Sequence, residues 1–129
     1  MALVPQELRY TKAHQWASKD GDGLITVGIT DYAQEALGDV VFIDLPTQGK
    51  TVLKDRAMFV VESVKAASDV FAPVSGTIAD VNDSLQTSPE ALNSSPYQAW
   101  IVRIQPTDPT EFDGLLGADA YEAETSDIA

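Results

Sequence analysis

The chain has 129 residues, which fits one domain with a substantial core, and its 44% hydrophobic and 22% charged residues are typical of a globular protein. Its formal net charge of −12 argues against binding to nucleic acid or anionic membranes, because both require a basic surface. The absence of cysteine excludes disulfides, thiolate metal sites and a cysteine nucleophile. The acidic charge serves either solubility or docking onto basic surfaces of partner proteins.

The N-terminal segment MALVPQELRY has too short an apolar run for a signal peptide, and no run elsewhere approaches the roughly 18 apolar residues of a membrane span. We therefore expect a soluble, intracellular protein in which residues 1–129 form a single domain. The first predicted strands flank DGDG (20–23), which is typical of a turn. Residues 16–18 and LITVGI (24–29) are predicted to pair there as a hairpin, because apolar and polar residues alternate in the second segment.

Further strands follow at short spacing. VVFIDL (40–45) is a continuous apolar run closed by Pro46, which predicts a buried strand. The remaining strands are expected in AMFVVES (57–63), DVFAPV (69–74), GTIADV (76–81) and AWIVRIQ (99–105). Short strands separated by Gly, Pro and Ser predict a mainly β protein, a flattened barrel or sandwich of antiparallel sheets.

Three short helices are predicted between and after the strands. In TDYAQEALG (30–38), Asp31 and Gln34 have the spacing of a capping box, and Gly38 ends the helix. TSPEAL (87–92) offers Ser88 as its N-cap, and TDPTEFDGLLG (107–117) offers Asp108. We expect a C-terminal helical segment over about residues 107–124, most of it a solvated acidic surface.

Side chains that could support catalysis or metal binding are sparse. His14 is the only histidine, and without a second histidine or a cysteine it favours a structural or surface role over a zinc or iron site. No serine lies in a G-x-S-x-G motif, and DGDG lacks the glutamate of a calcium-binding loop. The sequence therefore predicts that the protein is not an enzyme and holds no metal.

Lys65 stands out because its surroundings have a near-mirror composition. In VVESVKAASDVFAPVSG (60–76), valines lead into the lysine, a valine and a phenylalanine lead out of it, and a serine and an acid lie on each side. This pattern predicts a β-hairpin over about residues 57–74 with Lys65 at its tip. Small residues after the lysine leave the tip open to another enzyme's active site, which favours a modified carrier lysine. An ordinary charged turn is the alternative that the pattern alone leaves open.

Segments along nearly the whole chain resemble the glycine cleavage system H-protein family. They are YTKAHQW (10–16), VGITDYAQEALGDVVFIDLP (27–46), ESVKAASD (62–69) with APVSG (72–76), SPEALNSSPY (88–97) and DAY (119–121). Biotinyl domains typically have Met-Lys-Met at the hairpin tip, whereas this chain has Val64-Lys65-Ala66. The resemblance implies a flattened barrel of two antiparallel sheets with a few short helices, similar to lipoyl domains.

The function that the resemblance implies is that of a carrier. A separate lipoylating enzyme would attach lipoate to Lys65 through an amide, with Glu62, Ser63, Val64, Ala66 and Asp69 shaping the hairpin. The arm would accept an aminomethyl group from glycine decarboxylase (the P-protein) and present it to the tetrahydrofolate-dependent aminomethyltransferase (the T-protein). Dihydrolipoamide dehydrogenase (the L-protein) would then reoxidise it.

The resemblance also implies a cleft that shelters the loaded arm, with His14, Gln15 and Asp69 as candidate lining residues. The family usually has an acid where Gln15 stands, so the protection of the arm is expected to differ here. The segment PYQAW (96–100) lacks the family's glycine and is one residue shorter.

Two alternatives remain open from the sequence. An H-like protein that relays lipoate without glycine cleavage has the same features, and neighbouring genes for the P- and T-proteins would distinguish the two. The starting methionine and the lack of a transit peptide favour a bacterial cytoplasm over a mitochondrial matrix protein whose presequence was removed.

Overall fold

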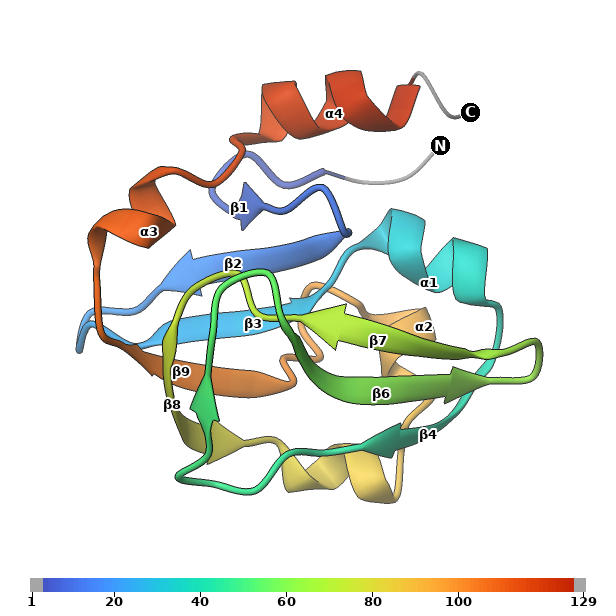
Figure 1. Ribbon diagram of the computed structural model, residues 1–129. Coiled ribbons are helices and arrows are strands. Elements are labelled where there is room, and N and C mark those ends of the chain that lie inside the picture. The colour runs from blue at the N-terminus through green and yellow to red at the C-terminus, as the bar shows by residue number, and fades with distance from the viewer. Residues whose placement is uncertain (1–3, 127–129) are drawn as a thin grey trace.

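The computed structural model describes residues 4–126, in which two antiparallel sheets pack against each other (Figure 1). The larger sheet has the strand order β1-β2-β3-β9-β8-β5, and the smaller one has the order β4-β6-β7. The strands of the larger sheet are β1 (Arg9–Tyr10), β2 (Gln15–Lys19), β3 (Ile25–Ile29), β5 (Thr51–Val52), β8 (Gly76–Val81) and β9 (Val102–Pro106). Those of the smaller sheet are β4 (Val40–Asp44), β6 (Ala57–Ser63) and β7 (Ala67–Phe71). The predicted mainly β fold is confirmed.

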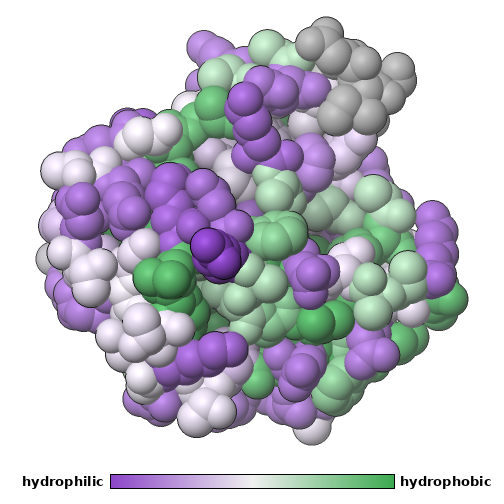
Figure 2. Space-filling model, viewed as in Figure 1, coloured by the Kyte–Doolittle hydropathy of each residue, from purple (hydrophilic) through white to green (hydrophobic). Residues whose placement is uncertain are grey.

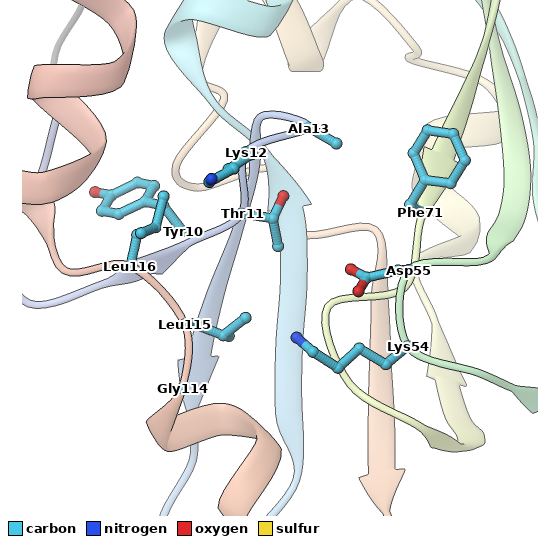
Figure 3. A pocket seen from close by; sticks show the side chains of 10 residues that line it. All are labelled: Tyr10, Thr11, Lys12, Ala13, Lys54, Asp55, Phe71, Gly114, Leu115 and Leu116. Atoms are coloured by element: carbon cyan, nitrogen blue, oxygen red, sulfur yellow. The ribbon is translucent and has the colours of Figure 1, made fainter.

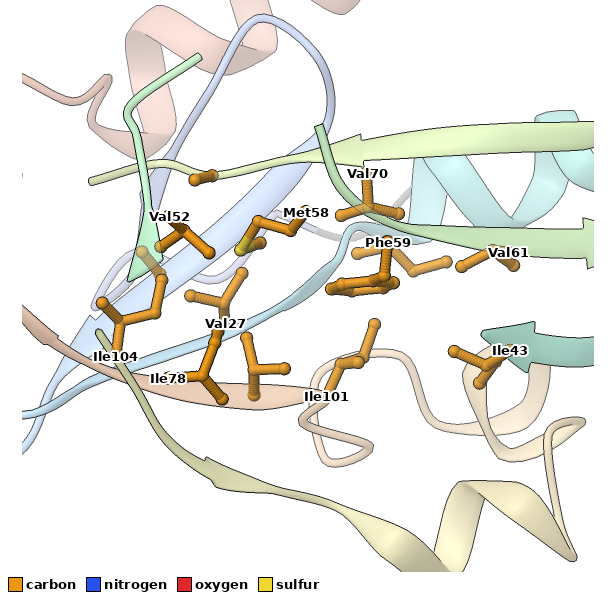
Figure 4. Packing of buried hydrophobic residues seen from close by; sticks show 14 of the residues in the cluster. Val27, Ile43, Val52, Met58, Phe59, Val61, Val70, Ile78, Ile101 and Ile104 are labelled. Carbon is orange, nitrogen blue, oxygen red and sulfur yellow. The ribbon is translucent and has the colours of Figure 1, made fainter. Parts of the chain in front are cut away.

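Sequence patterns placed most strands within a few residues of their observed bounds. β2 and β3 form the expected hairpin, with Trp16 opposite Gly28 and Lys19 opposite Ile25 across the turn at residues 20–24. The apolar side chains of the alternating strands are buried between the sheets, as Figure 4 shows for Val27 and Ile78, which lie opposite Met58 and Phe59. Burial of this cluster removes apolar surface from water and is the main force that holds the two sheets together.

One predicted strand is less buried than its composition indicated. VVFIDL was expected to be a buried strand, yet Val41 and Phe42 of β4 are 54% and 44% exposed. β4 is an edge strand of the smaller sheet, and its register with β6 shifts between Val40 and Phe42. This bulge turns both side chains outward, whereas Val40 and Ile43 remain in the core.

The helices are short and connect the sheets. They are α1 (Asp31–Leu37), a 3-10 helix η1 (Asp83–Gln86), α2 (Ala91–Ser94), α3 (Thr110–Asp113) and α4 (Ala118–Ser126). The predicted cap of α1 was wrong by one residue, because the side chain of Thr30 accepts the Ala33 N–H and Asp31 bonds Gln34 instead. Ser88 does not cap α2, which begins later, at Ala91. None of the helices in residues 4–126 has the length and apolar character that crossing a membrane requires.

The C-terminal segment is more than a solvated surface. α4 lies over β1 at the top of Figure 1, and a second apolar cluster joins them. In this cluster Tyr121 of α4 and Tyr10 of β1 are both fully buried and their rings stack, with 4.7 Å between centroids. The prediction that this segment is mostly a solvated surface was therefore incomplete, because Tyr121 is buried and holds α4 against β1. Tyr121 is surrounded in the sequence by acidic and small residues, which gave no sign of its burial.

Candidate functional site

Lys65 lies at the tip of the β6–β7 hairpin, which extends beyond the body of the protein at the right of Figure 1. The turn is organised by Ser63, whose backbone N–H donates to the carbonyl of Ala66 at 2.8 Å. The hydroxyl oxygen of Ser63 also accepts from the backbone N–H groups of Lys65 and Ala66, at 3.2 and 3.3 Å. The Ser63 side chain therefore provides hydrogen bonds for backbone N–H groups at the tip that have no partner on the opposite strand.

The neighbours of the tip are largely exposed. Val64 is 67% exposed, and its backbone N–H donates to the carbonyl of Asp39, which fixes the hairpin against the α1–β4 connection. Glu62 pairs with Ala67 across the hairpin, and Asp69 pairs with Val60. Hydrophobic side chains gather across the middle and right of the face in Figure 2, where the hairpin lies, while hydrophilic ones cover its left and upper parts.

The side chain of Lys65 turns back toward the C-terminal end of α1. Its Nζ donates to the carbonyl of Ala36 at 3.4 Å, and its Cε lies 3.3 Å from where a Cβ on Gly38 would be. The last carbonyls of a helix lack partners within it and carry partial negative charge, so they attract an ammonium group. The lysine is exposed, and Ala36, whose carbonyl its amine contacts, lines a cleft beside α1, so the amine lies at the rim of this cleft.

This cleft has a volume of about 190 Å³ and runs between α1, β7 and the residues that precede β2. Its walls are mostly apolar, and we call it the arm cleft; it is lined by Ala13, His14, Gln15, Ile29, Ala33, Ala36, Leu37, Val61, Ser68, Asp69 and Val70. The three cleft residues predicted from the sequence are therefore brought together, and Ala36, which accepts from the Lys65 amine, lines the same cleft. Asp69 is the one acidic residue in this lining.

Gln15 lines the arm cleft without offering a free polar group to it. The side chain is 3% exposed, its Nε2 donates to the carbonyl of Ala13 at 2.8 Å, and its Oε1 accepts the hydroxyl of Thr11 at 2.6 Å. Both ends of the amide are satisfied by the loop that precedes β2. Gln15 therefore braces this loop, and Asp69 is left as the cleft's exposed charge.

His14 joins the arm cleft to two more distant elements. Its Nδ1 lies 2.7 Å from the Tyr121 hydroxyl, which also lies 2.8 Å from Oγ1 of Thr30, the N-cap of α1. The His14 ring packs on Tyr32, with 4.5 Å between centroids. Burial lowers the pKa of His14 and raises the pKa of Tyr121, so both are neutral near pH 7.

Sequence reasoning had not identified Thr30, Tyr32, Ala36 or Tyr121 as neighbours of the site. The Thr30 cap could have been found, because a threonine directly precedes the helical pattern. The contact between His14 and Tyr121 spans 107 positions, and no local pattern carries such a signal.

Comparison with known proteins places the chain in a family. The family profile described as Glycine cleavage H-protein matches residues 8–128. The chain belongs to this family. It is 56% identical to the glycine cleavage system H protein of Citrobacter koseri and 52% identical to that of Halorhodospira halophila, over 98% of this chain and 99% and 98% of those proteins. A crystal structure of the H protein from Mycobacterium marinum superimposes with a TM-score of 0.87 and 39% identity, covering 95% of this chain and 99% of that one.

Members of the H-protein family carry lipoate covalently on a lysine and are carriers, not catalysts. The expected lipoyl-shuttle function in the glycine cleavage system is therefore confirmed at the level of the family. The site also fits such a group: an exposed amine stands at the rim of a cleft whose lining is mostly apolar. Conversion of the amine to an amide removes its charge, so a lipoyl chain there can contact apolar walls at little cost.

Proposed function

We propose that Lys65 is the lysine that carries lipoate in this chain. The observation that carries the proposal is its position: the residue stands at the tip of a hairpin, with a side chain that is exposed and reaches the rim of the arm cleft. Of the other lysines, Lys50 donates to the carbonyl of Met58 and the half-buried Lys54 to that of Pro73, and neither lies at the tip of a strand hairpin. A modifying enzyme needs a protruding amine, and Lys65 supplies it.

We further propose that the arm rests in the arm cleft between transfers. The bound lipoyl group would supply the dithiol that carries the aminomethyl unit. Ala33, Leu37 and Val70 would contact its chain, and Asp69 would pair with a cationic amine at its end. His14 and Gln15 would hold the shape of the cleft, because their polar atoms are engaged with Tyr121, Thr11 and Ala13.

The partners in this proposal are the P-, T- and L-proteins and a lipoylating enzyme. A flexible arm on a rigid fold holds its cargo at an effective concentration on the order of millimolar near a docked active site. The rigid support for the arm is the β6–β7 hairpin, residues 57–71, which is held in the core by Met58, Phe59 and Val61. We propose that residues 1–129 act as one carrier domain in a bacterial cytoplasm.

Peptide mapping tests the attachment site. The protein is lipoylated in vitro or in a lipoylating host, digested, and the lipoyl mass is assigned by tandem mass spectrometry. We expect the whole added mass on the peptide that contains Lys65. Lipoyl mass on a peptide containing Lys50 or Lys54 would contradict the proposed site, although the carrier function would stand.

A further inference from the structure

A second cavity, which the lipoyl arm does not require, lies beside the arm cleft. It has a volume of about 350 Å³, within the range of small-molecule sites, and Figure 3 shows its walls. The β1–β2 connection and residues 114–116 form one side, and residues 54–55 with Phe71 form the other. Ala13 lines both spaces, and Phe71 directly follows the cleft residue Val70.

The floor of this cavity is apolar and well fixed. Leu115 is 7% exposed on one wall, and Phe71 is half-buried on the opposite wall, whereas the Tyr10 ring points away toward α4 (Figure 3). The guanidinium of Arg9 donates to the carbonyls of Asp113 and Leu115, each at 3.3 Å, and holds that wall against β1. An apolar surface on two facing walls favours a ligand with an apolar body.

The charges at the cavity have the opposite sign to those of the whole protein. Two lysines and one acid line it, although the chain has 20 acids and 8 bases. Lys54 extends across the space toward Leu115 in Figure 3, and its Nζ donates to the carbonyl of Pro73 at 3.2 Å. Within residues 4–126 no carboxylate lies within 4.0 Å of this ammonium group. Its charge is therefore not neutralised by an ion pair.

The second lysine stands at the mouth of the same cavity. The side chain of Lys12 is 77% exposed and reaches Glu124 at 3.9 Å, a distance and exposure at which an ion pair contributes little. The Lys12 side chain can reorient toward a bound anion without losing a strong contact. Asp55, on the same wall as Lys54, points its carboxylate into the space and would repel a second negative charge.

We propose that this cavity binds an amphipathic small-molecule monocarboxylate, with the carboxylate held by Lys54 and Lys12 and the apolar body against Phe71 and Leu115. An ammonium group and a carboxylate form a charge-assisted hydrogen bond, which is stronger than a neutral one. A purely inorganic anion would leave the apolar walls without a partner. This inference goes beyond the proposed carrier function and does not depend on Lys65.

Titration with sodium octanoate, followed by backbone amide chemical shifts of the full chain, tests the proposal. We expect saturable shifts at Thr11, Phe71 and Leu115, with a dissociation constant of about 1 mM or below. Octanamide, which has the same chain and no charge, should bind about tenfold more weakly because it loses the charge-assisted bond. Absence of saturable shifts, or equal binding of octanamide, would overturn the proposal.

Two charge variants give opposite expectations in the same titration. Lys54→Gln should weaken octanoate binding about tenfold, whereas Asp55→Asn should strengthen it because a repulsive carboxylate is removed. Asp55 has φ +66°, and asparagine tolerates this left-handed conformation, so the turn is preserved. Lys19→Gln, at an exposed site at the end of β2, is the matched control and should bind as the wild type does. Equal affinities for wild type and Lys54→Gln, with circular dichroism confirming that the variant is folded, would contradict the assignment.

Discussion

The hydroxyl of Tyr121 lies 2.7 Å from Nδ1 of His14, so the C-terminal helix is bonded to a residue of the arm cleft. The same hydroxyl reaches Thr30, the N-cap of α1, whose last turn receives the amine of Lys65. α4, α1 and the cleft thus share one buried polar contact. Because Tyr121 is fully buried, water does not compete for it.

Removal of the Tyr121 hydroxyl should therefore destabilise the fold. Tyr121→Phe keeps the ring that stacks on Tyr10 but leaves His14 and Thr30 without this partner, which should cost about 1–3 kcal/mol of unfolding free energy. The matched control is Tyr32→Phe, since the Tyr32 hydroxyl makes no hydrogen bond within the described chain. Urea denaturation of the three proteins measures the difference. Equal losses for both variants would show that the shared contact is not stabilising.

Protonation of His14 should make stability depend on pH. Burial lowers the pKa of His14 from its ordinary value of 6.5, so the unfolded chain binds a proton that the native protein does not. The unfolding free energy should therefore fall as the pH decreases through 6.5, in addition to the effect of the carboxylates. His14→Asn removes this titration and suits the φ of +70° at this position. Denaturation at several pH values should give a shallower decline for the variant below pH 6.5, and parallel curves would contradict the assignment.

Gly38 controls the geometry beside Lys65. Its φ of 77° and ψ of −157° lie in a region that is essentially confined to glycine, and a Cβ there would lie 3.3 Å from Cε of Lys65. Gly38→Ala should destabilise the protein by about 1–3 kcal/mol. Gly117→Ala is the control, because no atom lies within 4 Å of its added Cβ. Thermal or urea unfolding that ranks the two variants equally would argue against strain at Gly38.

Docking of the carrier to its enzymes should depend on salt. The chain carries a net charge of −12, and Glu62, Asp39 and Asp69 lie close to the hairpin tip. Raising the salt concentration from about 0.05 to 0.5 M should slow association with glycine decarboxylase, because screening shortens the range of the attraction. Stopped-flow or surface-binding kinetics measures the rate. Association rates that do not change with salt would mean that the charge serves solubility alone.

How far the sequence could predict the site depends on how local each feature is. The hairpin and its tip are local, since apolar residues and a central Ser-Val-Lys-Ala turn specify them. The first strand lies at the expected residues 57–63, whereas the second lies at 67–71, two to three residues before the predicted 69–74. The exposure of Val41 and Phe42 depends on a bulge in an edge strand, which an apolar run does not reveal. The tie between His14 and Tyr121 depends on tertiary packing of the two chain ends, and the sequence offers no periodic signal for it.

The central claim is that Lys65 carries the lipoyl arm, and one substitution tests it most directly. Lys65→Arg keeps the positive charge at an exposed turn, so the unfolding free energy should change by about 0.5 kcal/mol or less. Arginine offers no nucleophilic amine, so the variant should gain no lipoyl mass in a lipoylating host. Lys19→Arg, at another exposed lysine, is the control and should be lipoylated as the wild type is.

The measurement is intact-protein mass after lipoylation, paired with glycine–bicarbonate exchange in the presence of glycine decarboxylase. We expect the Lys65→Arg protein to keep its unmodified mass and its exchange to fall to background, while wild type and Lys19→Arg gain the lipoyl mass and support exchange. If the Lys65→Arg protein is still lipoylated, another lysine is the attachment site. Full exchange by an unlipoylated variant would contradict the carrier mechanism itself.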